Sequence, residues 1–145
     1  MLNVIIRRLK PEDTDDIDRI YTAITKTPVR ADFRKITEEH ALKQENASFV
    51  AEIDGKVVGY IISYTLSSGF GVEKSAWIPS VGVDPRCMGQ GIGKRMAEEL
   101  FEFYRKTGIK DVHTSVRWDS TDLLSFFKTL DFYRSDFINL RKTLG

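Results

Sequence analysis

The stretch over residues 81–94 (VGVDPRCMGQGIGK) constrains the fold of this chain more than any other part of the sequence. A β-branched run leads into it, glycines stand at positions 89, 91 and 93, and an amphipathic helix pattern begins directly behind them. Glycine allows positive φ and close approach to a ligand, and the first N–H groups of a helix have no intrahelical acceptor. The stretch therefore predicts either a tight strand-to-helix turn or a cradle for an anion such as a phosphate, and the glycines alone do not decide between them.

The composition is that of one ordinary globular domain, which we place over residues 1–145. The chain is long enough to bury a core, and its 22 Lys and Arg residues balance 21 Asp and Glu residues to a net charge of +1. Nucleic acids and acidic membrane surfaces are bound by a clustered excess of Lys and Arg. Neither partner is expected here.

A single cysteine, Cys87, excludes an internal disulfide framework and every multi-cysteine metal motif, so no metal is expected. No apolar run approaches the length of about 18 residues that a membrane-spanning helix needs. The first residues, MLNVIIRRLK, do not have the pattern of a signal peptide. We expect a cytoplasmic protein.

The first half of the chain predicts three strands and two helices. Residues 4–9 read as a strand, and Ile17, Ile20, Tyr21 and Ile24 form the apolar stripe of a helix that ends at Thr27 and Pro28. A more polar helix is expected over residues 32–45. Residues 48–53 and 56–66 are two β-rich runs joined by Asp54 and Gly55, the pair typical of a type I′ hairpin.

The second half predicts a loop over residues 67–73 and a strand over residues 75–83 that is irregular at Pro79, because proline cannot donate to a ladder. A long helix follows the glycines and ends at Thr107 and Gly108. A strand over 111–116, a short helix over the apolar positions 123–130, and strands over 132–134 and 137–142 complete the chain. The expected fold is α/β (α+β): a mixed, mostly antiparallel sheet of six to seven strands, splayed at its central strands, with helices on both faces.

This order of elements resembles the GNAT superfamily of N-acetyltransferases, which transfer an acetyl group from acetyl-CoA to an amine. The resemblance covers almost the whole chain and has two specific parts. VGVDPRCMGQGIGK is similar to the acetyl-CoA loop of the superfamily, and SFFKTLDF (residues 125–132) is similar to its closing helix and strand.

The resemblance implies a co-substrate, acetyl-CoA, and a set of residues that bind it. The main chain of residues 81–83 is expected to pair with the pantetheine arm, and the amides of residues 89–94 are expected to bind the pyrophosphate. The implied cofactor-binding set is Val81, Gly82, Val83, Met88, Gly89, Gln90, Gly91, Ile92, Gly93, Lys94, Ser120 and Phe127.

The sequence departs from the superfamily pattern where proton transfer is concerned. Met88 stands where an Arg or Gln is usual, Phe127 where a tyrosine acid is usual, and Ser115 where the ribosomal-protein alanine acetyltransferases carry a glutamate base. The catalytic residues therefore stay unknown. Glu73 and Tyr133 are substitute candidates, although Glu73 also reads as a solvated loop carboxylate and Tyr133 as a strand-packing aromatic.

Two functions follow from these observations. The first is an acetyl-CoA-dependent N-acetyltransferase that transfers acetyl directly to a primary amine, either of a small molecule or of a protein or peptide N-terminus. The alternative is an acyl-CoA-binding regulatory module that lacks turnover, for which Met88, Ser115 and Phe127 argue. A homodimer formed by pairing of residues 137–142 is also expected, because an exposed closing strand offers unpaired backbone groups.

Overall fold

The computed structural model describes residues 3–67 and 73–145 and divides into two compact units, Met1–Ser115 and Val116–Gly145. Most of the loop expected over residues 67–73 thus lies outside the described residues. The first unit holds a sheet with its covering helices, and the second holds one helix and the C-terminal segment. Among the described residues, no helix has both the length and the apolar character needed to cross a membrane.

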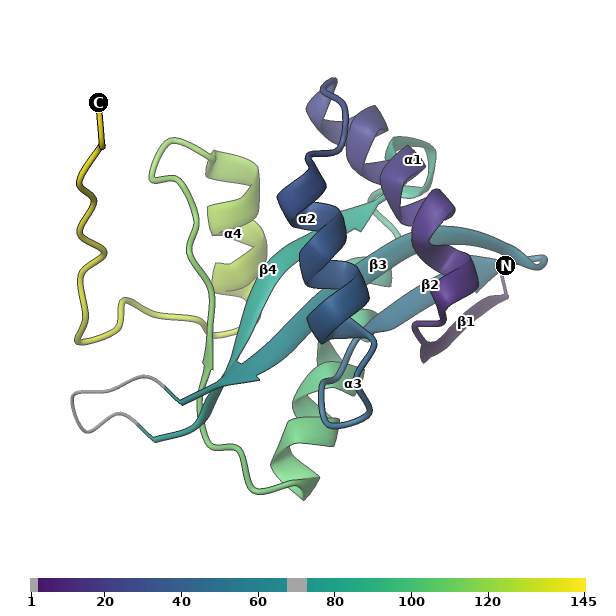
Figure 1. Cartoon of the computed structure of the whole chain (residues 1–145). Coiled ribbons are helices and arrows are strands. Elements are labelled where there is room, and N and C mark those ends of the chain that lie inside the picture. Colours follow the sequence, from purple (N-terminus) through teal and green to yellow (C-terminus); the bar gives the residue numbers. More distant parts are fainter. Residues whose placement is uncertain (1–2, 68–72) are drawn as a thin grey trace. The chain divides into compact units, whose positions relative to one another are not determined.

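A five-stranded mixed sheet forms the centre of the first unit (Figure 1). Its strands are β1 (Val4–Arg8), β2 (Phe49–Ile53), β3 (Lys56–Leu66), β4 (Ser75–Val83) and β5 (Val112–His113), and they lie in sequence order across the sheet. The first four strands pair antiparallel, and β5 pairs parallel to β4. The mixed, mostly antiparallel character of the sheet is as predicted.

The predicted hairpin between β2 and β3 is confirmed. Asp54 has φ of 51° and Gly55 has φ of 79°. Positive φ at both central residues is the mark of a type I′ turn, whose twist matches that of the strands on either side. The turn fixes the register of β2 against β3, which pairs Ile53 with Lys56.

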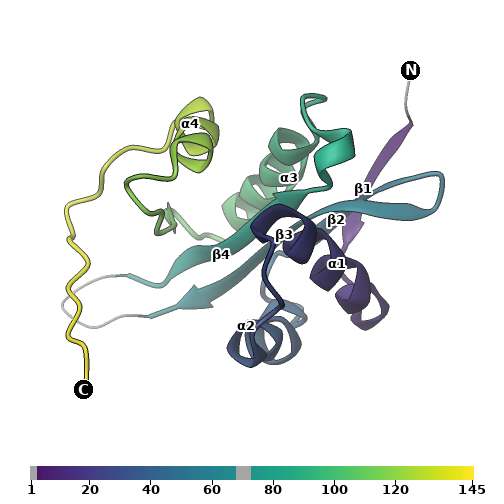
Figure 2. The same cartoon turned by 90° about the horizontal axis from the view of Figure 1, so that it is seen from above.

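Helices cover both faces of the sheet, as the sequence predicted. Figure 2 shows α1 (Thr14–Thr25) and α2 (Ala31–Ile36) on one face and α3 (Ile92–Lys106) on the other. The core under α1 consists of Leu9, Ile17, Ile20, Val50, Val57, Tyr60 and Ile62. From α3, Ile92, Met96, Ala97 and Leu100 are buried, and the Met96 and Ile92 side chains pack beside Gly59 of β3. Alternate residues of β3 thus supply two separate apolar layers.

The helix predicted over residues 32–45 is shorter than expected. The α-helical part, α2, ends at Ile36, and a π-helical turn, Thr37–Ala41, follows it directly. At the junction the Thr37 hydroxyl donates to the Phe33 carbonyl at 3.2 Å. A threonine that bonds back to the preceding turn competes with the backbone N–H groups for the same acceptors, and this favours a change of helical pitch there.

The irregularity predicted at Pro79 is a bulge in β4. Ser80 pairs with Ile62 and Trp77 pairs with Tyr64, so two residues of β4, Ile78 and Pro79, stand opposite one residue of β3. A bulge places the extra residue outside the ladder. Pro79 fits this position because it has no N–H to leave unpaired.

The second unit contains α4 (Thr121–Thr129), whose Phe127 is buried against Phe126 and Phe132 at ring-centroid distances of 5.2 and 5.0 Å. The strands predicted over residues 132–134 and 137–142 are wrong: these residues have no regular secondary structure. Only two residues of the strand predicted over 111–116 pair. A strand obtains its backbone hydrogen bonds from a neighbour, and no ladder among the described residues includes 132–142. The sheet therefore has five strands rather than six to seven.

A buried polar group ties α3 to the sheet and gives the first prediction. The Tyr104 hydroxyl accepts the Ala47 amide at 2.9 Å and shares a hydrogen bond of 2.6 Å with the Ser63 hydroxyl, which also bonds to the Ala47 carbonyl. Tyr104→Phe leaves the buried Ala47 N–H without an acceptor. We expect this variant to lose about 1–3 kcal/mol of unfolding free energy in urea titrations.

Tyr133→Phe is the matched control, because the Tyr133 side chain is 87% exposed. The same chemical change at an exposed site should leave the urea midpoint unaltered. Equal midpoints for Tyr104→Phe and the wild type would contradict the assigned network.

Candidate functional site

Strand β4 has an edge that its neighbour leaves open. Strand β5 pairs only with Ala76 and Trp77, and beyond them the Thr114 hydroxyl donates to the Ile78 carbonyl at 2.8 Å. Within the described part of the first unit, no strand pairs with this edge over residues 79–83. The edge of β4 is therefore unpaired by any described strand over these residues.

The register of β4 decides which backbone groups face the open edge. The Asp84 amide donates to the Val58 carbonyl of β3 at 2.7 Å, and backbone groups of an antiparallel strand face alternate sides from one residue to the next. We infer that Gly82 faces β3, whereas Val81 and Val83 direct their N–H and C=O groups toward the open edge. A ligand with amide groups can bind there in the manner of an added strand.

The chain leaves β4 through a tight loop into α3. A short 3₁₀ turn, η3 (Pro85–Cys87), begins the loop, and the Asp84 carboxylate accepts the Arg86 amide at 3.0 Å. Gly89 and Gly91 then have φ of 81° and 74°. Both conformations are strained for residues with a side chain, so these two glycines are required by the backbone itself.

Helix α3 starts without a cap. Its first intrahelical bond runs from the Arg95 amide to the Gly91 carbonyl at 3.1 Å, so the amides of Ile92, Gly93 and Lys94 have no acceptor within the helix. No described side chain caps this end, and the first turn contains no acidic residue. Free N–H groups and the positive end of the helix dipole favour an anion, which is the second of the two interpretations that the glycines left open.

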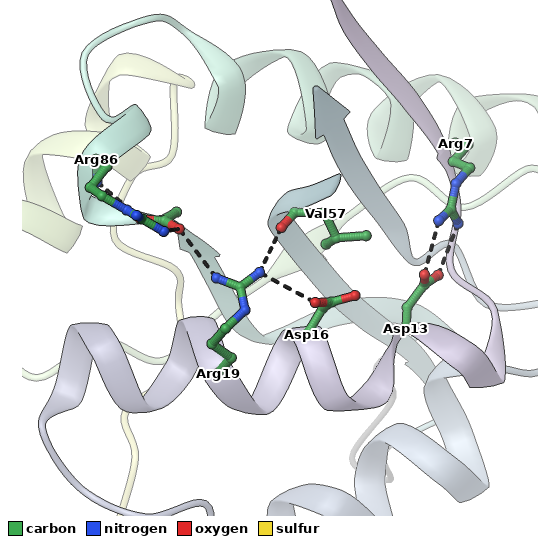
Figure 3. A network of polar contacts seen from close by, with 7 residues as sticks. Arg7, Asp13, Asp16, Arg19, Val57 and Arg86 are labelled. Atoms are coloured by element: carbon green, nitrogen blue, oxygen red, sulfur yellow. Dashed lines mark hydrogen bonds and ion pairs between the residues drawn. The ribbon is translucent and has the colours of Figure 1, made fainter. Parts of the chain in front are cut away.

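Helix α1 is attached to the sheet by two ion-pair networks (Figure 3). At its start, Arg7 of β1 makes two bonds of 2.9 Å to the Asp13 carboxylate and one of 3.0 Å to Glu52. Burial disfavours the charge of Asp13, but the hydrogen bonds from Arg7 and from the Lys10 amide outweigh it and lower the pKa of Asp13. The start of α1 is thereby fixed to the first two strands.

The second network fixes the start of the loop. Arg19 of α1 donates to the Asp84 carboxylate at 3.2 Å, to Asp16 at 3.3 Å and to the Val57 carbonyl at 2.8 Å (Figure 3). Arg86 adds two longer bonds to Asp84 of 3.3 and 3.4 Å. The side-chain and backbone hydrogen bonds from Arg86 lower the pKa of Asp84 to about 2, with a smaller contribution from Arg19. The Asp84 carboxylate is thus an anchor, charged at neutral pH, that joins α1, β4 and the glycine loop.

Sequence reasoning missed this anchor, although one signal for it was present. An Asp immediately before a proline and a short turn is typical of a helix cap. Its pairing with Arg19 depends on contact between residues 65 positions apart, which no local pattern reveals.

The structure places the remaining predicted site residues as follows. Met88 is 59% exposed and Gln90 is exposed, whereas Ile92 is buried and can offer only its amide to a ligand. Ser120 immediately precedes α4, and Phe127 of α4 is buried and in ring contact with Phe126 and Phe132. Their cofactor-binding roles stay predictions.

The two catalytic candidates have solvent-exposed side chains. Glu73 is exposed just before β4, and Tyr133 is 87% exposed in the second unit. His113 stacks on Trp77 at a centroid distance of 4.7 Å, the packing role expected of a half-buried histidine. Within residues 3–67 and 73–145, no three His, Cys, Asp or Glu side chains gather closely enough to hold a metal ion.

Comparison with known proteins identifies the sequence pattern. Residues 14–132 match the model of the acetyltransferase (GNAT) family. The chain is 28% identical over 117 residues to a mycothiol acetyltransferase of Amycolatopsis mediterranei, covering 79% of this chain and 37% of that protein. It is 33% identical over 101 residues to an uncharacterized N-acetyltransferase of Methanocaldococcus jannaschii, covering 70% of this chain and 59% of the other. The chain thus spans less than two thirds of the length of these two curated relatives.

Among solved structures, an aminoglycoside N-acetyltransferase in complex with CoA superposes with a TM-score of 0.80. The match covers 99% of this chain and 96% of the other, at 14% sequence identity. At this level of identity the likeness concerns the fold.

The Asp84 anchor gives the second prediction. Its folded-state pKa of about 2 lies below the value near 3.9 of an unfolded aspartate, so its stabilisation is complete above about pH 4 and is lost as the pH falls through about 2. We expect Asp84→Asn to lower the unfolding free energy by about 1–2 kcal/mol at pH 7, a figure reduced because Arg86 is solvent-exposed. In urea titrations the difference from the wild type should shrink between about pH 4 and pH 2.

Asp119→Asn serves as the control, since Asp119 pairs with Arg117 on the surface of the second unit. That variant should unfold like the wild type throughout the pH range. An Asp84→Asn difference that stayed constant down to pH 2 would show that the carboxylate charge is not the source of the stability.

Proposed function

Because the chain belongs to the acetyltransferase (GNAT) family, we propose that it transfers an acetyl group from acetyl-CoA to a primary amine. The observation that carries this proposal is the continuity of two binding features. The open edge of β4 leads through the glycine loop into the uncapped start of α3. One extended molecule with amides at one end and a diphosphate at the other matches this path.

The residues present fit acetyl-CoA. Backbone groups of Val81 and Val83 are available to the pantetheine amides, and the amides of residues 89–94 to the pyrophosphate. The exposed Lys94 adds a positive charge beside these amides. When bound, acetyl-CoA supplies an activated acetyl group as a thioester, and the chain contributes alignment of the two substrates and fixed N–H dipoles near the reacting carbonyl.

Direct transfer to the amine is the route that these residues support. The amine must reach the carbonyl as a neutral nitrogen. An α-amino group with a pKa near 8 is partly neutral at pH 7, whereas a lysine near 10.4 must lose its proton at a cost of roughly 4–5 kcal/mol. Since neither Ser115 nor Phe127 can act as the usual base or acid, we propose an acceptor of low pKa, a small-molecule amine or a peptide N-terminus. The names of the relatives, a mycothiol acetyltransferase and an aminoglycoside acetyltransferase, support small-molecule amines.

The family match includes parts of both units, since it covers residues 14–132. This supports our proposal that the chain is one acetyltransferase domain over residues 1–145. The lone thiol of Cys87 supports the cytoplasmic location expected from the sequence. Fractionation of the source cells would test that location directly.

The third prediction concerns CoA binding. Gly91 and Gly108 stand at opposite ends of α3, both have positive φ, and a Cβ atom added at either would meet nothing within 4 Å. Glutamate at either position therefore introduces similar backbone strain and the same charge, but only Gly91→Glu puts that charge at the proposed pyrophosphate site. We expect Gly91→Glu to weaken acetyl-CoA binding at least tenfold in calorimetry, while Gly108→Glu binds like the wild type. A wild-type protein that binds neither acetyl-CoA nor CoA would exclude the co-substrate.

A measurement of turnover distinguishes the two candidate functions, an acetyltransferase and an acyl-CoA-binding regulatory module. Thiol release from acetyl-CoA is measured with a panel of amino sugars, amino acids, polyamines and N-terminal peptides. A rate above the hydrolysis of acetyl-CoA alone, absent in Gly91→Glu, establishes the transferase. Tight binding of acetyl-CoA without thiol release on any member of the panel would favour the regulatory module.

We also propose a homodimer, which gives the fourth prediction. Residues 137–142 carry β-forming side chains that are exposed, with Ile138 at 82% and Leu140 at 83%. Pairing of this segment with a second copy would bury them. We expect the wild type to sediment as a dimer, Ile138→Lys as a monomer, and the control Asn139→Lys, on the opposite side of an extended segment, as a dimer. A monomeric wild type at micromolar concentration would exclude the proposal.

A further inference from the structure

In the described part of the first unit, two buried tyrosines each share a hydrogen bond with a serine hydroxyl. Tyr104 pairs with Ser63 at 2.6 Å on the α3 side, and Tyr60 pairs with Ser80 at 2.8 Å on the α1 side. Both tyrosines are about 1% exposed. The two pairs therefore consist of the same hydroxyl groups and have equally buried tyrosines. They differ in the burial and the other hydrogen bonds of the serine.

The Tyr104 pair is closed. Ser63 is fully buried and is bonded to the Ala47 carbonyl, while the Tyr104 hydroxyl is also bonded to the Ala47 amide. Every hydrogen-bonding group of the pair thus has a partner in the protein. This pair is structural.

The Tyr60 pair is open. Ser80 is only half-buried, and among the described residues its hydroxyl has no hydrogen-bond partner besides Tyr60. Burial, opposed in part by the bond to Ser80, raises the pKa of Tyr60 to about 12, so the phenol keeps its proton. Either hydroxyl can donate in the 2.8 Å bond between them. In both directions the Ser80 oxygen retains at least one lone pair for another molecule.

A glycine at position 82 makes the contact between Tyr60 and Ser80 possible. The Tyr60 ring crosses β4 directly over Gly82, since a Cβ atom on Gly82 would lie 2.9 Å from the ring and 2.9 Å from the Ile24 side chain. Any side chain at position 82 would displace the ring. Glycine at position 82 thus allows a buried tyrosine from β3 to reach the hydroxyl of Ser80 on β4.

Ser80 lies at the end of the proposed donor path where the acetyl group belongs. Acetyl-CoA carries its pyrophosphate and its thioester at opposite ends of the pantetheine arm. With the pyrophosphate at the start of α3 and the arm along Val83 and Val81, the thioester lies beyond Val81, next to Ser80 and the bulge. The Ser80 side chain lies on the same face of the sheet as Tyr60, the face covered by α1, and is itself only half-buried.

We propose that the Ser80 hydroxyl is the hydrogen-bonding site of the acceptor amine, and that Tyr60 is the residue that positions it. The free lone pair of Ser80 accepts an N–H of the amine and directs the nitrogen lone pair at the thioester carbon. No proton is transferred to Ser80 in this arrangement. The inference rests on the proposed acetyltransferase function and adds to it the face from which the acceptor enters, between α1 and β4.

The test uses the full chain and the amine of the panel that gives the fastest thiol release. We expect Ser80→Ala to lower kcat/KM for the amine about tenfold, because one hydrogen bond to the nucleophile is lost. The dissociation constant of acetyl-CoA should stay within twofold of the wild type. Ser80→Thr keeps the hydroxyl and should stay within threefold of the wild type in kcat/KM.

Tyr60 is tested through its coupling to Ser80. Tyr60→Phe should also lower kcat/KM, and the double variant Tyr60→Phe/Ser80→Ala should be no slower than Ser80→Ala alone, because Tyr60 acts only through Ser80. Tyr104→Phe is the matched control at the closed pair. It should lose stability in urea yet keep the kinetic constants of the wild type at a temperature where it is folded.

The outcomes separate this inference from the proposed function. Wild-type turnover that Ser80→Ala leaves unchanged, or a Ser80→Ala variant that weakens acetyl-CoA binding instead, overturns the acceptor site alone. Fully additive losses in the double variant overturn the positioning role of Tyr60. A wild type that turns over no amine of the panel overturns the proposed function, and the acceptor site with it.

Discussion

The backbone pairing of β4 is the constraint on which the rest of the structure depends. A central strand normally has both edges occupied, which leaves no N–H or C=O group for a ligand. Here the bulge at Ile78 and Pro79 coincides with the end of pairing to β5, so the following residues are held by β3 on one side only. Pro79 favours this break chemically, because a residue without an N–H cannot continue a regular ladder. The position of Pro79 in the sequence therefore favours an open edge over the residues of β4 that follow it.

An open strand edge needs compensation, since fewer hydrogen bonds hold it. Two features supply this. The start of α1 is joined through Asp13 and Arg7 to the first two strands, and Arg19 reaches Asp84 at the end of β4. Asp84 is also bonded to β3 through its amide and to the loop through Arg86. The conformation of the glycine loop is thus fixed by contacts that precede it, and the first amides of α3 are left without an acceptor within the helix.

Much of the fold follows from local sequence patterns. The hairpin at Asp54 and Gly55, the irregularity at Pro79 and the long helix behind the glycines were all predicted, because each is determined by residues close together in the chain. The strands predicted over 132–142 were wrong for the opposite reason. A β-forming pattern shows that a segment is able to pair, but a strand exists only where a partner strand is available.

In the candidate site, too, the features set by neighbouring residues were predictable and those set by distant residues were not. Positive φ at Gly89 and Gly91 and the uncapped helix start follow from the motif itself. The Asp84–Arg19 pair and the Tyr60–Ser80 pair join residues 65 and 20 positions apart, and no local pattern reveals which residues pair. Sequence reasoning consequently located the open strand edge and the helix start that we propose for the donor, which are backbone features, but not the side chains arranged around them.

Gly82 contributes both to the backbone groups of the candidate site and to the placement of the side chains around them. As part of VGV it resembles a backbone position in the donor motif, and its register directs its polar groups to β3 rather than to the open edge. Its contribution lies in the missing side chain, which leaves room for the Tyr60 ring and brings a phenol to Ser80. Over residues 80–83, β4 thus directs the backbone groups of Val81 and Val83 to its open edge and the Ser80 hydroxyl to the α1 face. A strand with this arrangement can hold a donor along its edge and receive an acceptor from one face, so that the two molecules meet beside the bulge without competing for the same groups.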